Sequence, residues 1–409
     1  MMSRITECRI CGSSEITPVL DLGLTPLADR LVKQEKVGQE DPKFPLEVGF
    51  CESCSLVQIM ETVPPSILFC EDYPYYSSFS DHLLKHSKDN VDSIIKERTL
   101  GSDSLVVELA SNDGYLLKNY VNNGIPVLGI DPAEGPAKEA EKIGVPTLND
   151  FFSKSLAMTL FAKGQQADVI HANNVLAHVA DLNSFVSGIA LLLKEDGVVV
   201  IEAPYLKNLV DDCEFDTIYH EHLCYFSVTA LNVLFANHQL SLNRVVRLSI
   251  HGGSLRLFVG KQKQVEASVT ELLNLEASSG VDCVDYYKRF SDRVDVVTKT
   301  LKEKLIQLKA DGASIAAYGA AAKGSTLINT AGIGTDLIEF VADKNIHKQG
   351  LFMPGQHIPI CSPEVILERM PNYLLILPWN FTDEILEQQS EYREKGGKFI
   401  IPIPELKIV

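Results

Sequence analysis

The length, composition and charge of this chain indicate a globular protein with more than one domain. Its 409 residues exceed what one hydrophobic core usually organises, and 45% hydrophobic with 22% charged residues is an ordinary globular composition. No apolar run approaches the roughly 20 residues that span a bilayer, and the N-terminus lacks the apolar core of a signal peptide. We therefore expect a cytoplasmic protein without a membrane partner. The net charge of −17 would repel a phosphate backbone, which argues against nucleic acid as the main partner.

Two close cysteine pairs near the N-terminus, Cys8 with Cys11 and Cys51 with Cys54, indicate a metal site. The chain has nine cysteines, an odd number, and in a cytosolic protein such pairs favour metal ligation over disulfides. Each Cys-x-x-Cys can present two thiolates to one ion, and four thiolates are the closed ligand set of structural zinc. Iron in a rubredoxin-like site and four buried thiols are the alternatives. We expect residues 1–75 to form this zinc-binding domain.

Helical and strand patterns then follow one another along the chain. Residues 76–100 carry apolar side chains at helical spacing, with Ser80 or Asp81 as the expected N-cap. Strand-like runs alternate with helical patterns at 105–109, 127–130, 167–171 and 197–202, and a further strand-like run lies at 242–250. This alternation predicts a parallel sheet with helices on both faces.

The second half of the chain repeats this alternation after a helical stretch. Residues 261–310 are charged and helical, and a strand at 315–318 begins a second series of strands and helices. We therefore predict an α/β protein with four parts: the zinc-binding domain, a central Rossmann-like domain at 76–260, linking helices at 261–312 and a C-terminal Rossmann-like domain at 313–409.

The end of the first central strand has the residues of a cofactor site. Glu108 closes the strand, a turn of small residues follows, and Asp131 closes the next strand, where a carboxylate can accept hydrogen bonds from ribose hydroxyls. Asp113 in the turn would repel a pyrophosphate but suits the cationic S-adenosylmethionine, so we favour this cofactor over NAD(P). A plain strand-to-helix turn is the other alternative. The expected cofactor-binding residues are Glu108, Ala110, Asn112, Asp113, Gly114, Asp131, Asn173 and Asn174.

The run Tyr219-His220-Glu221-His222 follows the fourth strand and is the strongest candidate for catalysis. As a zinc site it is weak, because no further ligand is evident nearby. Methylation of carbon requires removal of a proton, and a neutral imidazole is the usual base near pH 7. Tyr219 could donate a hydrogen bond to a developing enolate, and Glu221 could orient a sugar hydroxyl or an imidazole. A polar loop that only caps an element is the alternative. Taken alone, His178 is more often a surface or core histidine than a catalytic one.

A third motif, Tyr318-Gly-Ala-Ala-Ala-Lys323-Gly-Ser, resembles a turn that cradles phosphate. Its backbone N–H groups and Lys323 could hold a pyrophosphate, although it lacks the spacing of a nucleotide triphosphatase loop. Arg256, His347 and Lys348 are possible further cations, but most such residues are simply solvated.

The order of these motifs resembles that of the bacterial nucleotide-sugar C-methyltransferases. The shared segments are the two cysteine pairs, YYSSFS, ELASNDGYLL, NNVLAHV, IYHEHLCYFS, HGGSLR and YGAAAKGSTLIN, and they span essentially the whole chain. The resemblance implies an N-terminal zinc domain, a central S-adenosylmethionine domain and a C-terminal domain that helps to enclose the substrate. It also implies a 4-keto-deoxysugar on dTDP or a related nucleotide, methylated typically at C-3. We expect a monomer or small homo-oligomer.

The resemblance also assigns roles to residues. His222 resembles the family's base, and Tyr219, Glu221 and His178 resemble its other active-site positions. Tyr76 and Ser78 resemble a segment that closes over cofactor and sugar. A zinc-containing RNA or protein methyltransferase, a non-catalytic nucleotide-sugar-binding protein and an NAD-dependent sugar dehydrogenase or epimerase are the alternatives. The expected substrate contacts are Tyr76, Ser78, Tyr225, Arg256, Tyr318, Lys323 and Asn380.

Overall fold

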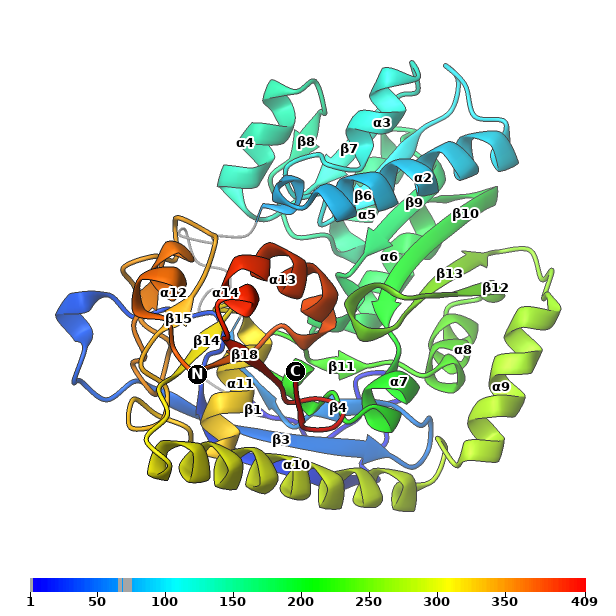
Figure 1. Cartoon of the computed structure of the whole chain (residues 1–409). Helices are drawn as coiled ribbons and strands as arrows, with labels where there is room; N and C mark the ends of the chain where they lie inside the picture. Colours follow the sequence, from blue (N-terminus) through cyan, green and yellow to red (C-terminus); the bar gives the residue numbers. More distant parts are fainter. Residues whose placement is uncertain (1–2, 65–67, 69–75) are drawn as a thin grey trace.

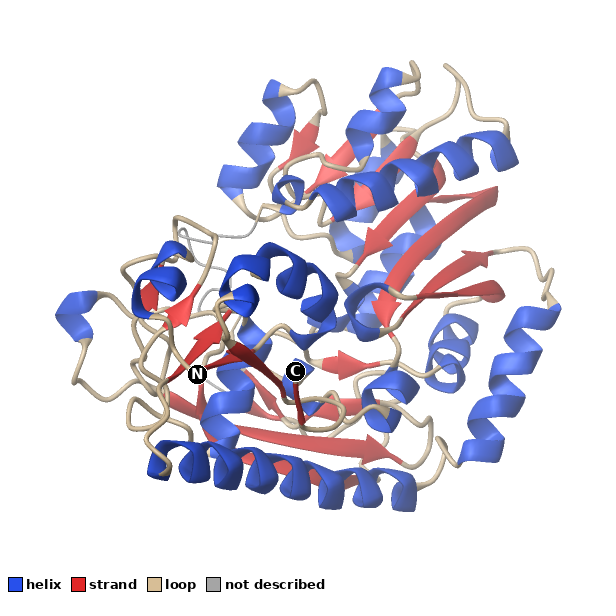
Figure 2. Ribbon diagram, viewed as in Figure 1, coloured by secondary structure: helices blue, strands red, loops and turns tan. Residues whose placement is uncertain are grey.

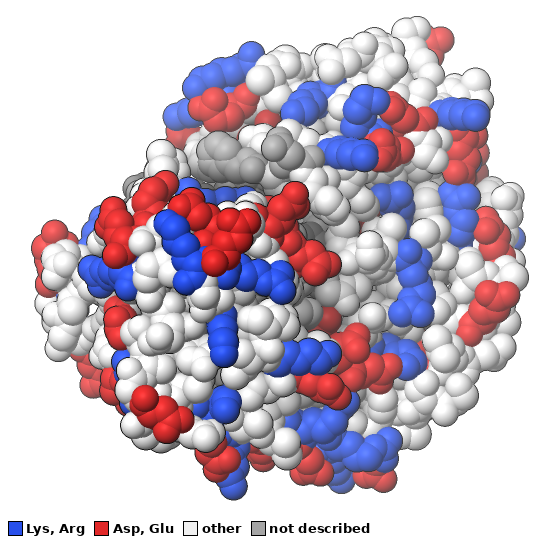
Figure 3. All heavy atoms as spheres, in the orientation of Figure 1, with Lys and Arg blue, Asp and Glu red and all other residues white. Residues whose placement is uncertain are grey.

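The computed structural model describes residues 3–64, 68 and 76–409, and its strands gather into three main sheets (Figure 1, Figure 2). Tyr75, the first residue of the YYSSFS segment, lies outside the described residues. No helix in the described part of the chain is both long and apolar enough to cross a membrane. On the face in Figure 3, acidic side chains gather over the C-terminal helices and basic ones are interspersed without forming a continuous stripe.

The first sheet combines the N-terminal segment with a strand from much later in the chain. Its order is β11-β4-β3-β2 and every neighbouring pair is antiparallel. Because β11 directly follows the Tyr219–His222 run, this sheet ties the candidate base to the N-terminal segment. The strands are β2 (Ile16–Pro26), β3 (Lys43–Cys51), β4 (Val57–Ile59) and β11 (Cys224–Tyr225), with β1 (Ser3–Arg4) paired to β5 (Glu61–Thr62) and a short helix η1 (Gln34–Lys36).

The second sheet has seven strands in the order β12-β13-β10-β9-β6-β7-β8. The five strands from β10 to β8 are parallel, and the sequence predicts four of them; the fifth, β8, is not predicted. Strand β13 runs antiparallel to both of its neighbours. The sheet is therefore mixed rather than wholly parallel. The strands are β6 (Val106–Leu109), β7 (Val127–Ile130), β8 (Thr147–Leu148), β9 (Ala167–Asn173), β10 (Leu193–Pro204), β12 (Ser241–Leu248) and β13 (Ser254–Gly260).

Helices cover both faces of this second sheet because successive strand residues point to opposite sides. Val106 and Val169 pack with the side chains of α2, α3 and α4, whereas Val107 and Ile170 pack with those of α5, α6 and α8. The helices are α2 (Asp81–Arg98), α3 (Leu117–Asn122), α4 (Glu134–Lys142), α5 (Lys154–Ala162), α6 (Leu182–Leu192), α7 (Leu206–Asp211) and α8 (Val228–Asn237). The short helices are η2 (Ser77–Phe79), η3 (Leu176–His178), η4 (Phe215–Thr217) and η5 (Ile250–Gly252).

Two long helices then lead back to the first sheet. The helix α9 (Ala267–Ser279) is followed by α10 (Val284–Ala310), which runs beneath β3 in Figure 1. The rings of Phe50 on β3 and Tyr287 on α10 lie 4.8 Å apart. The predicted linking helices therefore also form one side of the N-terminal core.

The third sheet has the order β16-β15-β14-β17-β18-β19, parallel except for β19. Its first strand, Ile315–Tyr318, has the predicted bounds. Side chains of α11 pack on one face of the sheet and those of α12, α13 and α14 on the other. The elements are β14 (Ile315–Tyr318), α11 (Ala322–Ala331), β15 (Val341–Ala342), β16 (Ile360–Cys361), α12 (Glu364–Arg369), β17 (Tyr373–Ile376), η6 (Trp379–Phe381), α13 (Thr382–Gln388), α14 (Ser390–Glu394), β18 (Lys398–Ile401) and β19 (Lys407–Ile408).

Candidate active site

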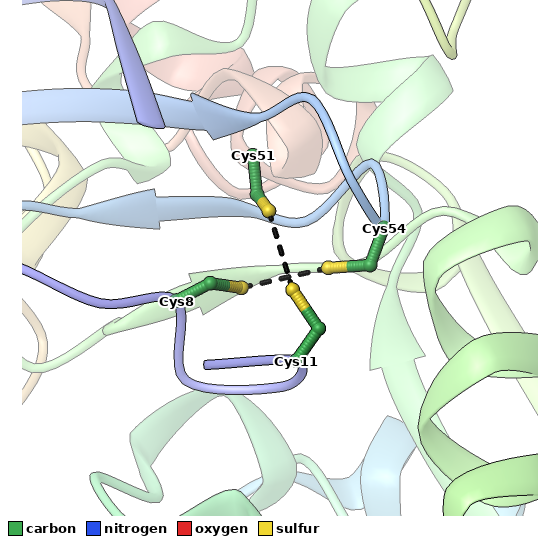
Figure 4. A group of neighbouring side chains, drawn as sticks. All are labelled: Cys8, Cys11, Cys51 and Cys54. Atoms are coloured by element: carbon green, nitrogen blue, oxygen red, sulfur yellow. Dashed lines mark hydrogen bonds between the residues drawn. The ribbon is translucent and has the colours of Figure 1, made fainter. Parts of the chain in front are cut away.

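The four N-terminal cysteines form the predicted metal site (Figure 4). Their sulfur atoms all lie within 4.8 Å of one another, and the Cys8–Cys54 and Cys11–Cys51 sulfurs are 3.5 Å apart. Tetrahedral zinc with Zn–S bonds of about 2.3 Å separates its sulfurs by about 3.8 Å, so the four thiolates fit this ion. The hydrogen bond between the Cys54 thiol and Cys8 lowers the pKa of Cys8 and raises that of Cys54, so the two sulfurs share one proton at close approach.

The two cysteine knuckles have the same backbone course. Gly12 and Ser55, the residues that follow each second cysteine, both have a left-handed backbone, with φ of 72° and 61°. In each knuckle the N–H of that residue donates to the carbonyl of the first cysteine, over 2.9 Å from Gly12 to Cys8 and 2.8 Å from Ser55 to Cys51. The turns therefore present both pairs of sulfurs to one point.

Contacts on both sides hold the Tyr219–His222 run in place. His220 is fully buried, and its Nε2–H donates to the carbonyl of Pro45 on β3 over 3.1 Å. The N–H of Leu223 donates to the carbonyl of Ala177 over 2.7 Å, and the N–H of Ile59 donates to the carbonyl of Leu223 over 3.0 Å. His220 thus anchors the run to the N-terminal sheet, which leaves His222 on the side of the central sheet.

The hydrogen bonds of His222 fix its tautomer. Nδ1 lies 2.9 Å from the carbonyl oxygen of Thr217, and because a carbonyl only accepts, Nδ1 carries the proton. Nε2 is then the basic nitrogen, and it accepts from the hydroxyl of Tyr219 over 3.0 Å. An imidazole held in this way can remove a proton on its Nε2 side.

His178 lies beside His222, with ring centroids 4.8 Å apart. Its Nδ1–H donates to the carbonyl of Glu221 over 2.7 Å, so its Nε2 is also the basic nitrogen. Burial lowers the pKa of His178, which keeps the ring neutral at pH 7. Four predicted catalytic residues, Tyr219, Glu221, His222 and His178, therefore come together.

The environment of Glu221 differs from that of an ionised carboxylate that orients a sugar hydroxyl or an imidazole. Burial raises the pKa of its carboxyl to about 8, and its Oε2 is buried without a hydrogen-bond partner among the described residues. The group is therefore largely protonated at pH 7 and can donate a hydrogen bond.

The predicted cofactor residues line the carboxyl edge of the central sheet. Ala110, Asn112 and Gly114 have left-handed backbones, with φ of 57°, 48° and 76°. The carboxylate of Asp131 accepts from the backbone N–H groups of Asn112 and Ala133, each over 2.8 Å. The turn is thus closed by the neighbouring strand, and its backbone donors do not all face outward as a phosphate cradle would require.

Buried acceptors at this edge suit S-adenosylmethionine. Glu108 Oε2, Asp113 Oδ1 and Asn173 Oδ1 are buried oxygens without a hydrogen-bond partner among the described residues. Burial, followed by the charges of Asp131 and Asp113, raises the pKa of Glu108 well above its ordinary range. The Asp113 and Asn173 oxygens fit the ammonium, amine and ribose hydroxyl groups of the cofactor, and a bound cation would favour the ionised, accepting form of Glu108. Asn174 has a left-handed backbone with φ of 54°, and its N–H donates to the carbonyl of Glu202 over 2.7 Å.

The segment before α2 lies on the cofactor turn. The N–H of Ser77 donates to Asn112 Oδ1 over 2.9 Å, and the N–H of Ser78 donates to Asp113 Oδ2 over 3.1 Å. The hydroxyl of Tyr76 lies over α4, where a Cβ built on Gly135 would approach it to 2.9 Å. The segment that the sequence predicts to cover the cofactor therefore contacts the turn directly.

The expected substrate-binding residues lie in separate parts of the structure. Lys323 donates to Asn380 Oδ1 over 2.9 Å, and the hydroxyl of Tyr318 donates to Gln388 over 3.2 Å. Tyr225 is buried in β11 and lines a cavity of about 20 Å³ beside His222, which has room for about one water molecule.

Arg256 lies on the central sheet rather than on the C-terminal domain. Its guanidinium donates to the buried Glu202 over 2.7 Å and lies 3.1 Å from Nε2 of His86. Lys348, also considered as a cation for a diphosphate, donates to the carbonyl of Ala320 over 2.7 Å. The contacts of both residues are with other protein groups.

Three groups beside the site have no signal in the sequence pattern. The first is the carbonyl of Thr217, which accepts from His222. The other two are the side chains of Asp216 and Trp379, which form a hydrogen bond of 2.8 Å between two distant segments. A backbone carbonyl leaves no trace in residue identity, and a pair 163 residues apart is visible only in the folded chain.

Three family models match successive parts of the chain. They are a "Putative zinc binding domain" at residues 8–69, a "Methyltransferase domain" at 83–245 and a "C-methyltransferase C-terminal domain" at 249–404. The chain is 35% identical to the C-methyltransferase NovU of Streptomyces niveus, over 99% of this chain and 97% of that protein. The chain belongs to this family of C-methyltransferases.

More distant similarities are confined to part of the chain. A ubiquinone biosynthesis O-methyltransferase of Bartonella quintana is 28% identical over 24% of this chain and 39% of its own length. The solved structure of magnesium protoporphyrin IX methyltransferase from Synechocystis has a TM-score of 0.34 and 16% identity, covering 44% of this chain and 82% of its own.

These findings confirm the predicted class of protein. The chain is an S-adenosylmethionine-dependent C-methyltransferase with a mixed α/β fold, an N-terminal zinc-binding domain with four cysteines and a C-terminal sheet domain.

Proposed function

We propose that this C-methyltransferase acts on a nucleotide-linked 4-keto-deoxysugar, a dTDP sugar methylated at C-3, with His222 as the base. The observation that carries the proposal is the pair of hydrogen bonds that leaves the basic Nε2 of His222 beside the hydroxyl of Tyr219. A keto group makes the proton on the adjacent carbon acidic enough for an imidazole to remove.

The reaction would use the residues as follows. Nε2 of His222 takes the proton from C-3, and the electron pair moves toward the keto oxygen. Tyr219 is the proposed donor to the enolate: its hydroxyl, which donates to this Nε2 in the structure, would turn to the keto oxygen when the sugar is bound. The protonated carboxyl of Glu221 is proposed as a second donor to the sugar. S-adenosylmethionine, which the oxygens around Glu108 and Asp113 would hold, would supply the methyl group to C-3, with the methyl–sulfur bond breaking and S-adenosylhomocysteine leaving. Base catalysis of this kind contributes about 10²–10⁴-fold to the rate.

The remaining proposed substrate contacts stand around this centre. His178 lies against His222 and is neutral, so it can accept a hydrogen bond from a sugar hydroxyl. Tyr76 and Ser78 belong to the segment on the cofactor turn, and we propose that they cover the sugar. From the C-terminal domain, we propose that the nucleotide is contacted by Tyr318, Lys323 and Asn380. We also propose that Tyr225 and Arg256 contact the substrate.

Two measurements test the base and the substrate separately. In D₂O without cofactor, the wild-type enzyme should exchange the C-3 proton of a 4-keto sugar nucleotide. His222→Gln should lose this exchange and at least 10²-fold of methyl transfer while its Kd for S-adenosylmethionine changes less than twofold. His82→Gln, at an exposed position of α2, is the matched control and should keep both activities.

Exchange that continues at the wild-type rate in His222→Gln would show that another residue is the base. For the substrate, thermal-shift measurements with dTDP, UDP, GDP and CDP should give a selective stabilisation by one nucleotide. Equal, negligible shifts with all four would contradict a nucleotide-linked substrate.

A further inference from the structure

The short helix η4, which ends one residue before the catalytic run, is buried between the base and the C-terminal domain. The side chains of Phe215 and Asp216 are fully buried, and α11 of the C-terminal domain packs directly on this helix. Its last residue, Thr217, supplies the carbonyl that accepts from Nδ1 of His222. Any displacement of η4 would therefore reach the imidazole through a single hydrogen bond.

Two hydrogen bonds from the C-terminal domain flank Thr217. On one side, Nε1–H of Trp379 donates to Asp216 Oδ2 over 2.8 Å. On the other side, the hydroxyl of Thr326 on α11 donates to the carbonyl of Ile218 over 3.2 Å. The C-terminal domain thus holds the residues before and after the carbonyl that orients the base.

The Asp216–Trp379 contact is also supported by charge. Burial raises the pKa of Asp216 to about 6, against the opposing effect of the nearby Lys323 ammonium, so the group is largely ionised at pH 7. Lys323 lies 4.6 Å from the centre of the Trp379 ring and is held by Asn380. A hydrogen bond to a buried carboxylate is stronger than one between neutral groups, and loss of its donor is correspondingly costly.

We propose that Asp216 and Trp379 are positioning residues, through which the C-terminal domain fixes the Thr217 carbonyl and so holds His222 with its basic Nε2 toward the substrate. This inference rests on the proposed role of His222 as the base. It gives the C-terminal domain a part in catalysis in addition to enclosing the substrate. The other explanation is that the contact only packs the two domains together.

Trp379→Phe tests the inference because it removes the Nε1–H donor and keeps an aromatic ring beside Lys323. Without this donor η4 should shift and the Nδ1–H bond to Thr217 should weaken. Imidazolium is then less stabilised, so the acidic limb of the pH–rate profile should move to lower pH. We expect kcat to fall about tenfold while KM for the sugar nucleotide changes less than threefold. Thr326→Val, which removes the second flanking bond, should act in the same direction.

A double-mutant cycle separates positioning from packing. If Trp379 acts through the base, His222→Gln combined with Trp379→Phe should be no slower than His222→Gln alone. If the two losses multiply, or if Trp379→Phe leaves both kcat and the acidic limb unchanged, the positioning role is wrong. Tyr392→Phe is the matched control: it removes a buried hydroxyl that donates to Pro371 within the same domain and should leave kcat and the acidic limb unchanged.

A spectroscopic readout keeps this inference distinguishable from the proposed function. In ¹⁵N-histidine spectra, wild-type His222 should show the proton on Nδ1, and Trp379→Phe should show a mixture of tautomers. The tautomer of His222 tests the positioning geometry independently of catalysis. If His222→Gln retained turnover, only the assignment of the base would be overturned. An unchanged Nδ1–H tautomer in Trp379→Phe would overturn the positioning role.

Discussion

At the scale of single residues, the site is bordered by two buried carboxyls that resist ionisation. Burial raises the pKa of Glu214 and of Glu221 to about 8 in each case. Glu214 lies against the last residue of η5, Gly252, where an added Cβ would come within 2.4 Å of the carboxyl oxygen. The positive φ of 85° and this close approach explain why glycine stands at position 252.

The raised pKa of Glu214 should make stability depend on pH. In the unfolded chain this carboxyl loses its proton near pH 4.5, whereas in the folded chain it keeps the proton up to about pH 8. The folded state therefore binds the extra proton in this window, and the free energy of unfolding falls as pH rises from 4.5 to 8. Glu214→Gln cannot ionise, so its stability relative to wild type should rise across the window, by about 3.5 kcal/mol between pH 4.5 and pH 7.5.

Urea unfolding at pH 4.5, 6 and 7.5 measures this difference. The exposed Glu303→Gln is the control and should reproduce the wild-type slope. A constant stability difference between Glu214→Gln and wild type at all three pH values would contradict the raised pKa.

At the scale of elements, the start of α2 connects helix capping to cofactor binding. The hydroxyl of Ser80 accepts from the N–H of Leu83 over 3.2 Å, which caps the helix as the sequence predicts. The three residues before this cap form η2, whose amides donate to Asn112 and Asp113. The cap therefore also fixes the segment that lies on the cofactor turn.

Ser80→Ala should weaken cofactor binding as well as the helix. Loss of an N-cap hydroxyl typically costs about 1 kcal/mol, and fraying of the first turn would loosen the amides on the cofactor turn. We expect Kd for S-adenosylmethionine to rise three- to tenfold, measured by titration calorimetry. Ser153→Ala removes the corresponding cap of α5, which accepts from Leu156 over 3.3 Å. It should lower stability by a similar amount with no change in Kd, and equal Kd values in the two variants would contradict the link.

The elements also show what could be predicted from sequence. Strands such as Ile315–Tyr318 and Val127–Ile130 have the predicted bounds, because each is a continuous apolar run closed by a turn. The strands β8 and β11 have two residues each, too few for any periodicity, and the reversed direction of β13 is not encoded in its pattern. His178 meets His222 as the motifs and the family resemblance imply. The contact between Asp216 and Trp379 depends on the packing of two domains and could not be predicted.

At the scale of the whole molecule, the three sheets share a continuous core. One cluster of buried side chains extends from Cys8 through the central sheet to Ile403 near the C-terminus. Polar contacts reinforce it: Nδ2 of Asn183 on α6 donates to the carbonyls of Arg9 and Ile10, inside the first cysteine knuckle, over 3.0 and 3.2 Å. The zinc domain is therefore packed on the catalytic domain rather than tethered to it.

This continuity predicts that zinc stabilises the whole chain and the active site together. Without the metal, the knuckles at Cys8 and Cys51 lose their common ligand. β4 then loosens together with its partner β11, the strand that follows the catalytic run. Structural zinc supplies on the order of 10 kcal/mol to small metal-dependent domains, so its loss should propagate beyond the N-terminal segment.

Cys54→Ser should contain less zinc by elemental analysis and unfold in a single calorimetric transition at a lower temperature, with methyl transfer reduced at least tenfold. Cys283→Ser changes an exposed cysteine outside the cluster and should match wild type in all three measurements. A second transition at the wild-type temperature in Cys54→Ser would show instead that the zinc domain unfolds independently of the catalytic core.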